Sequence, residues 1–173
     1  MKIVIGSDHA GYDVKEIIIK TLKEKDHEII DVGTDSNQST IYSIYGLAVG
    51  KCINEFQADL GVVICGSGIG IMNAASKFKN TRTCLCREIN DAKIARETYN
   101  ANILALGARV NGIELIKAIV NTFITTKFTA IQSNINLVKQ LNSLGCNFDK
   151  LLFKEQIDQI KNFDVNKIPS ILK

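Results

Sequence analysis

The sequence predicts a doubly wound α/β fold, Rossmann-like or flavodoxin-like, with a five-stranded parallel sheet and a helical C-terminal extension. Short apolar, β-rich segments alternate with segments of helical periodicity from the first residues onward. Leu60–Ile64 is apolar at nearly every position, as expected of a strand buried on both faces of a parallel sheet. Because crossovers between parallel strands are right-handed, the simplest strand order is the flavodoxin-like 2-1-3-4-5.

The elements follow in order along the chain. Strands are predicted at Lys2–Ile5, His27–Val32, Leu60–Ile64, Thr81–Leu85 and Ile103–Leu106. Apolar residues at helical spacing predict helices within Val14–Leu22, Tyr45–Phe56, Ile71–Phe78, Asn90–Tyr99 and Ile116–Phe123. Beyond about Lys127 the alternation stops, and amphipathic helices are expected around Ile135–Leu144 and Leu151–Ile160, separated by a break at Gly145–Asn147. We therefore predict an α/β core over residues 1–128 and a helical extension of the same domain over residues 129–173.

Composition narrows the function classes. With 173 residues and 46% hydrophobic content, the chain suits one domain with a full core. The net charge of +3 suits a phosphorylated small molecule, but the sequence has no basic tract interleaved with aromatics, which argues against nucleic acid. Five irregularly spaced cysteines, no charged leader and no long apolar run predict a reduced cytoplasmic protein that does not insert into membranes. Cys84 and Cys86 lack the second Cys or His pair of a zinc site.

The third predicted strand ends at Cys65, which is followed by the glycine-alternating loop Gly66, Ser67, Gly68, Ile69 and Gly70. Such glycines permit close backbone approach, and the amide groups that begin the next helix attract negative charge. In the alternative interpretation, the free cysteine is only a small buried hydrophobe and the glycines after the strand only tighten a turn. A thiol packed for volume would be expected within the strand, whereas a thiol at the mouth of an amide-lined loop has a physical reason to ionise.

A second polar loop, Gly6-Ser-Asp-His-Ala-Gly-Tyr12, follows the first strand and opens at the same sheet edge. Asp8 and His9 can therefore face Cys65 across the crevice, within reach of a bound polyol. Asp8 as a helix N-cap and His9 as a surface imidazole form the alternative interpretation. Convergence of two polar loops favours the functional one, while His27, at the opposite edge, is expected to be solvated surface.

Other reactions of this fold class lack their residues here. The loop Gly6–Gly11 lacks the second glycine of a dinucleotide fingerprint, and the third glycine after Cys65 comes one place too early. A phospho-receiver domain would need an aspartate at position 65, and the lysine of a phosphate-binding P-loop is absent. We therefore expect no dinucleotide cofactor.

Four motifs in order resemble the type B ribose-5-phosphate isomerase family, which includes both subunits of galactose-6-phosphate isomerase. They are Gly6-Ser-Asp-His-Ala-Gly11, Asp31-Val-Gly-Thr34, Ile64-Cys-Gly-Ser-Gly-Ile-Gly70 and Asn102-Ile-Leu-Ala-Leu-Gly-Ala-Arg109. The resemblance runs from Met1 to about Phe128. Gln57-Ala-Asp-Leu-Gly61, Asn100-Ala-Asn102 and the long C-terminal extension are most similar to the galactose-6-phosphate branch.

The resemblance implies an aldose–ketose isomerisation through a cis-enediolate, with no metal or organic cofactor. Cys65 would move the proton between C2 and C1. The amide groups of Gly66, Gly68, Ile69 and Gly70, with the hydroxyl of Ser67, where the family usually has threonine, would meet the enediolate oxygens. Asp8 and His9 match positions that contact the sugar, and Arg109 matches an arginine near the phosphate.

The sequence departs from the family pattern at three places. Thr98 and Tyr99 stand where the family has a His-Asn pair for ring opening and substrate contact. Ala130–Ile135 replaces the segment with two phosphate-binding arginines, and Ile41-Tyr-Ser43 replaces Asp-Tyr-Pro. Since the family builds each site from two chains, a same-fold subunit is expected to supply the missing groups.

Several alternatives remain open at this point. Galactose 6-phosphate to tagatose 6-phosphate stands ahead of ribose 5-phosphate to ribulose 5-phosphate, and the oligomer can be a homo- or hetero-oligomer. A non-catalytic sugar-phosphate-binding paralogue is the competing class, against which the retained Cys65 argues.

Overall fold

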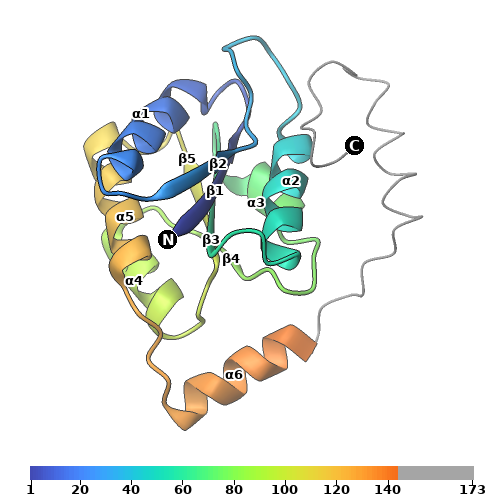
Figure 1. Cartoon of the computed structure of the whole chain (residues 1–173), viewed down its shortest axis with the longest axis vertical. Coiled ribbons are helices and arrows are strands. Elements are labelled where there is room, and N and C mark those ends of the chain that lie inside the picture. Colours follow the sequence, from blue (N-terminus) through green and yellow to red (C-terminus); the bar gives the residue numbers. More distant parts are fainter. Residues whose placement is uncertain (144–173) are drawn as a thin grey trace, which may run out of the picture.

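The computed structural model describes residues 1–143 as a three-layer α/β sandwich, with one parallel sheet between two layers of helices (Figure 1). The strands are β1 (Lys2–Ser7), β2 (Glu28–Asp31), β3 (Leu60–Cys65), β4 (Thr83–Leu85) and β5 (Ile103–Gly107). The helices are α1 (Tyr12–Lys23), α2 (Tyr42–Asn54), α3 (Ile69–Ala75), α4 (Ile89–Glu97), α5 (Ile113–Thr125) and α6 (Gln132–Ser143). The predicted α/β class with five parallel strands is confirmed.

Two apolar clusters hold the layers together. Helices α2 and α3 cover one face of the sheet, with Tyr45 and Ile71 in the cluster. Helices α1, α4 and α5 cover the other face, where Ile18 and Phe123 are fully buried. Each buried side chain of this size stabilises the fold by about 1.5–3 kcal/mol relative to exposure. Strands β1, β3 and β5 must be apolar on both faces because both faces are covered.

The strand order is β2-β1-β3-β5-β4, so the predicted order 2-1-3-4-5 is wrong in its last two strands. Every residue of β5 is buried, which suits a central strand, whereas the three residues of β4 are all half-buried. Strand β4 is short and contains a polar residue, Thr83, and both properties are common in strands at a sheet edge. Because β5 rather than β4 is adjacent to β3, the loop after β5 lies directly beside the loop after β3.

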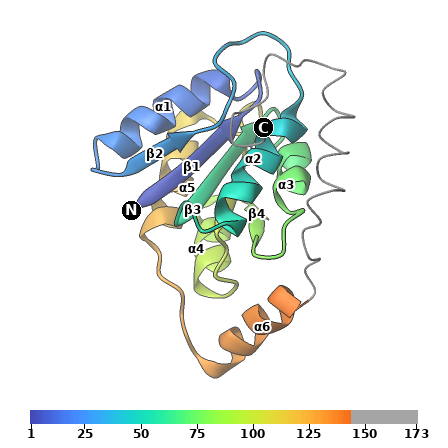
Figure 2. The same ribbon diagram turned by 45° about the vertical axis from the view of Figure 1, so that its right-hand side comes forward.

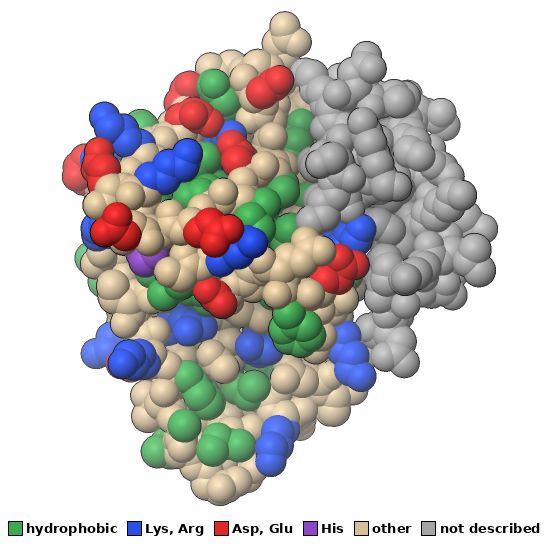
Figure 3. All heavy atoms as spheres, viewed as in Figure 1, with side chains coloured by type: hydrophobic (Ala, Val, Ile, Leu, Met, Phe, Trp, Pro, Cys, Tyr) green, Lys and Arg blue, Asp and Glu red, His purple; other side chains and the backbone are tan. Residues whose placement is uncertain are grey.

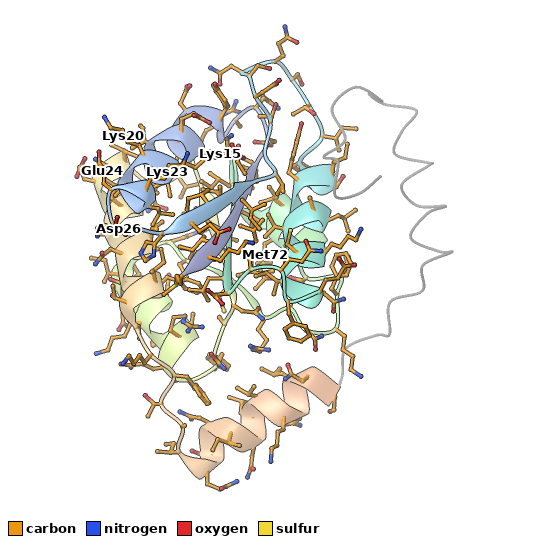
Figure 4. The ribbon with its side chains drawn as sticks, in the orientation of Figure 1. Lys15, Lys20, Lys23, Glu24, Asp26 and Met72 are labelled. Carbon is orange, nitrogen blue, oxygen red and sulfur yellow. The ribbon has the colours of Figure 1, made fainter. Side chains whose placement is uncertain are left out.

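Lys15 ties α1 to the sheet. Its side chain is 2% exposed, and its Nζ lies 2.5 Å from Asp31 Oδ2 and 2.9 Å from Glu16 Oε1. Figure 4 shows Lys15 where α1 lies over the sheet, while Lys20 and Lys23 leave the same helix elsewhere. Burial alone would lower the pKa of Lys15, but the hydrogen bonds to the two carboxylates raise it. The pair therefore anchors the carboxyl end of β2.

Helix α6 stands apart from the sandwich, below it in Figures 1 and 2. None of its residues is buried, and hydrophobic side chains gather over it in Figure 3. Polar contacts hold it near the core: Arg82 Nη1 donates to Asn142 Oδ1 at 3.0 Å, and Asn134 Nδ2 donates to the carbonyl of Glu97 at 3.3 Å. The first predicted helix of the extension is confirmed. The predicted break at 145–147 and the second helix lie outside the described residues.

Across residues 1–143, no helix combines the length and apolar character needed to cross a bilayer.

Candidate active site

Cys65 is the last residue of β3 and lies at the carboxyl edge of the sheet. All six residues of the strand are buried, and Cys65 itself is 4% exposed. The backbone N–H of Gly68 donates to Cys65 Sγ at 3.1 Å. The loop after the strand therefore folds back over the thiol, and an amide hydrogen points at the atom that would carry charge as a thiolate.

Gly68 makes that loop possible. Its φ of +80° lies in the left-handed region that other residues avoid. A Cβ at this position would lie 2.5 Å from Leu85 Cδ1 and 2.9 Å from the carbonyl carbon of Leu106. Helix α3 begins directly after it, at Ile69, two residues earlier than the sequence predicted. Because α3 has only seven residues, individual amide groups rather than a long helix dipole attract an anion here.

The outer part of the loop faces solvent. Ser67 is exposed, and its Oγ accepts a hydrogen bond from the N–H of Ile69 at 3.3 Å. The aromatic ring of Tyr42 covers Gly70, since a Cβ on that glycine would lie 2.7 Å from Tyr42 Cζ. We did not predict Tyr42 as a lining residue. The one available signal was that Tyr42 is the residue kept where the family has Asp-Tyr-Pro.

Asp8 lies at the same edge, as predicted. Its N–H donates to the carbonyl of Ile64 at 3.3 Å, which joins the loop after β1 to the end of β3. Its Oδ1 accepts from the N–H groups of Ala10 at 2.9 Å and Gly11 at 3.2 Å. Burial raises the pKa of Asp8, and His9 and these amide bonds oppose the rise. One oxygen thus organises the turn before α1, but the interpretation of Asp8 as the helix N-cap is wrong, because the N-cap of α1 is Gly11, which has no side-chain cap hydrogen bond.

His9 is half-buried beside Asp8. Its Nδ1 accepts a hydrogen bond from the backbone N–H of Thr40 at 3.1 Å. In the neutral ring the proton therefore resides on Nε2, which can donate to a ligand. Sequence reasoning found His9 but not Thr40, because a contact made by a backbone amide leaves no signal in the side-chain pattern.

Arg109 joins the site because β5 is the neighbour of β3. Its backbone N–H donates to the carbonyl of Gly66 at 3.0 Å. Its side chain runs past the loop, with Cδ 3.5 Å from the position of a Cβ built on Gly66, and it is exposed. An exposed guanidinium beside an amide-lined loop suits a phosphate group.

Thr98 and Tyr99 do not join this group within one chain. They lie between the end of α4 and the start of β5, and therefore at the amino edge of the sheet. Gly61 pairs with Ile103 and Cys65 pairs with Gly107, so four strand residues, about 13 Å, separate the two edges. The predicted ring-opening and substrate-contact positions therefore face away from Cys65. His27 also lies at the amino edge, and it is half-buried, with Nδ1 3.5 Å from the N-terminal nitrogen of Met1.

The electrostatics of the other thiols differ from what a reactive cysteine needs. Burial raises the pKa of Cys52 to about 11 and that of Cys86 to about 12, so both stay protonated at neutral pH. Among the described residues, no three His, Cys, Asp or Glu side chains gather in a way that could hold a metal ion.

This fold and this edge define a class of protein, the α/β enzymes that bind a small anionic substrate above the carboxyl ends of their strands. The model of one family, described as ribose/galactose isomerase, matches residues 3–141. The chain belongs to that family. The membership confirms the predicted enzyme class, an aldose–ketose isomerase of phosphorylated sugars.

Individual relatives support the same assignment. The chain is 40% identical over 144 residues to galactose-6-phosphate isomerase subunit LacB of Clostridium acetobutylicum, covering 83% of each chain. It is 39% identical over 127 residues to ribose-5-phosphate isomerase B of Escherichia coli, covering 73% of this chain and 85% of the relative. The solved structure of ribose-5-phosphate isomerase B from Clostridium thermocellum superposes with a TM-score of 0.81 at 40% identity, covering 83% and 97% of the two chains.

Proposed function

We propose that this chain is one subunit of a two-chain enzyme that interconverts galactose 6-phosphate and tagatose 6-phosphate. The observation that carries the proposal is the buried Cys65 thiol at the sheet edge, with the Gly68 amide 3.1 Å from its sulfur. Similarity to the LacB subunit supports the hexose substrate. The absence of the family's His-Asn pair at Thr98 and Tyr99 supports a second subunit.

The mechanism is a proton transfer through a cis-enediolate. The thiolate of Cys65 removes the proton from C2 of the open-chain aldose, and the electron pair moves to form the C1–C2 double bond while the carbonyl oxygen gains negative charge. The same sulfur then returns the proton to C1 as the hydroxyl proton of O2 passes to O1 and the C2 oxygen becomes a carbonyl. Both protons and the electron pair stay within the substrate and the thiol, so the isomerisation consumes no oxidant.

The surrounding groups have separate roles in this proposal. Amide groups from Gly66 to Gly70 and the hydroxyl of Ser67 stabilise the enediolate oxygens as charge develops. Asp8 and His9 hydrogen-bond the sugar hydroxyls, and Arg109 binds the phosphate.

Cys65→Ala and Cys65→Ser are expected to abolish turnover, because neither a methyl nor a neutral hydroxyl accepts the C2 proton near pH 7. Sugar-phosphate affinity, measured by calorimetry, should largely survive. Cys52→Ala is the matched control, since it removes a protonated, fully buried thiol on α2, away from this edge. Near-normal rates in the Cys65 variants would rule out this thiol as the base.

A same-fold partner is expected to supply the ring-opening acid. Cyclic sugar phosphates must open before C2 becomes accessible, and neither Thr98 nor Tyr99 is a good acid at pH 7. The isolated chain should therefore be a poor isomerase, and mixing it with a same-fold subunit that carries the His-Asn pair and paired arginines should restore turnover. Erythrose 4-phosphate cannot form the ring. Its turnover at saturation should therefore differ less between the isolated chain and the two-chain enzyme than the turnover of a cyclic substrate does. Full activity of this chain alone on a cyclic substrate would refute the partner model.

Ribose 5-phosphate is the second candidate substrate, favoured by the 39% identity to ribose-5-phosphate isomerase B of E. coli and by the solved relatives. Turnover of both sugar phosphates by the same purified complex distinguishes the two. A chain that binds both without turnover, with or without its partner, would instead be a sugar-phosphate-binding paralogue.

We also propose that the enzyme works in the cytoplasm. The four cysteines among the described residues, Cys52, Cys65, Cys84 and Cys86, are all free thiols, which is typical of proteins in reducing compartments. The proposed base needs the same environment, because oxidation would remove the thiolate.

A further inference from the structure

A chain of two hydrogen bonds connects His9 to the interior of α2. The N–H of Thr40 donates to His9 Nδ1 at 3.1 Å, and the hydroxyl of Thr40 lies 3.1 Å from the hydroxyl of Tyr45, where either oxygen can donate. Tyr45 is 1% exposed and belongs to the core cluster between α2 and the sheet. His9 and Thr40 are half-buried. The chain thus runs from a core side chain to an imidazole at the crevice.

The side-chain bond matters because Thr40 lies in an irregular segment. The residues between β2 and α2 form no regular secondary structure, and the chain enters α2 through Ile41 in an extended conformation. Rotation of the peptide before Thr40 would turn its N–H away from His9. The contact with the buried Tyr45 hydroxyl fixes the threonine and, with it, the direction of that N–H.

The direction of that N–H decides which nitrogen of His9 carries the proton. A neutral imidazole has one donor and one acceptor nitrogen, and an amide that donates to Nδ1 favours the tautomer protonated at Nε2. Nε2–H is then the group left to donate to an oxygen acceptor in the crevice. The opposite tautomer would offer the sugar a lone pair in place of a hydrogen.

We propose that Thr40 and Tyr45 are positioning residues, which hold His9 in one orientation and as its Nε2-protonated tautomer. The effect on catalysis rests on the proposed function, because it assumes that His9 contacts the sugar. The effect on the tautomer does not, since it is a property of the free protein.

Imidazole ¹⁵N spectra of the full chain at alkaline pH test the proposal without any substrate. The sequence contains two histidines, so His27→Gln assigns both rings. The wild-type His9 should show nearly all of its protons on Nε2. Tyr45→Phe, which keeps the buried ring, and Thr40→Val, which keeps the branched shape, should each shift His9 toward a mixture of tautomers. Thr40→Ser should restore the wild-type spectrum.

Thr21→Val is the matched control, because the Thr21 hydroxyl donates to the carbonyl of Ile17 within α1, away from this loop. In the assembled enzyme, Tyr45→Phe and Thr40→Val should lower kcat/KM about 5- to 30-fold, the effect of losing one or two kcal/mol. Thr40→Ser and Thr21→Val should stay near wild type.

An unchanged His9 tautomer in both Tyr45→Phe and Thr40→Val would overturn the proposal, as would a shift of equal size in Thr21→Val. A wild-type chain that shows the Nε2 tautomer and loses it in these variants, but isomerises no sugar phosphate with any partner, would contradict the proposed function while supporting the positioning of His9.

Discussion

Gly68→Ala tests whether the loop over Cys65 depends on one backbone conformation. A left-handed φ costs a non-glycine residue about 1–2 kcal/mol. The added methyl would also lie 2.9 Å from the carbonyl carbon of Leu106 and 3.1 Å from the nitrogen of Gly107. Both atoms belong to the backbone of β5, which cannot move aside as a flexible side chain can. Such overpacking costs a further ~1–3 kcal/mol.

Alanine also lowers the conformational entropy of the unfolded chain, which stabilises the folded state by about 0.4–1 kcal/mol. The net expected loss for Gly68→Ala is therefore about 1–5 kcal/mol, or a decrease of about 0.5–2.5 M in the urea midpoint for a slope near 2 kcal/mol per M. Circular dichroism during urea unfolding at fixed protein concentration measures it. Turnover should fall further than the unfolded fraction explains, because the loop shift moves the Gly68 amide away from the Cys65 sulfur.

Gly66→Ala is the matched control, two residues away in the same loop. A Cβ there meets nothing closer than Arg109 Cδ at 3.5 Å, an ordinary contact, and Gly66 has no positive φ. Its free energy of unfolding should stay within about 0.5 kcal/mol of wild type or rise slightly. Equal midpoints for the two variants would refute the reasoning about Gly68.

Three further outcomes are expected. Burial raises the pKa of Asp8 above its ordinary 3.8, so the unfolded chain ionises first and stability falls as pH rises through that interval; Asp8→Asn should be more stable than wild type at pH 7 and lose the advantage below pH 3.8 in urea titrations. Asp31→Asn should cost about 2 kcal/mol and Lys15→Met about 1, because the first removes one of the two carboxylates that pair with a lysine 2% exposed, leaving only Glu16, whereas the second leaves a carboxylate that is 38% exposed; the reverse ranking of urea midpoints would contradict this. Calorimetry should detect no NAD(P) binding, and chelators should leave turnover unchanged; micromolar affinity for either nucleotide would contradict the expectation that the two glycine loops bind no dinucleotide.

Hydrophobic patterning was sufficient to locate the strands and helices in the sequence, but it was not sufficient to predict which strands are adjacent in the sheet. The apolar runs of β3 and β5 were located correctly because burial on both faces leaves almost no polar residue in a strand. The order of β4 and β5 was missed, although Thr81–Leu85 mixes polar and apolar residues and Ile103–Leu106 does not. A rule that places the mixed strand at the edge would have given the observed order.

The residues of the candidate site also fall into those that the sequence could locate and those that it could not. Cys65 and Asp8 could be located because Cys65 ends one strand and Asp8 directly follows another, and parallel strands all end at one edge. Tyr42 and Thr40 could not, since covering Gly70 and bonding His9 are contacts between segments some 30 residues apart, and no local pattern encodes them. The position of Thr98 needed only topology, because a helix that precedes a strand ends at the amino edge.

That topology supports the proposal that two chains form the site. The carboxyl edge presents the base, the amide-lined loop and one arginine, whereas the residues at the family's acid positions lie about 13 Å of strand away at the amino edge. No loop movement in this chain can bring Thr98 to Cys65 without dismantling β5, since the strand between them is fully buried. An acid that reaches a sugar bound above Cys65 must therefore come from another chain or from this edge itself, where His9 lies; the other histidine, His27, lies at the amino edge. Under the proposed two-chain function, replacement of the His-Asn pair by Thr98 and Tyr99 therefore alters the site of the neighbouring subunit rather than the site that contains Cys65 of the same chain.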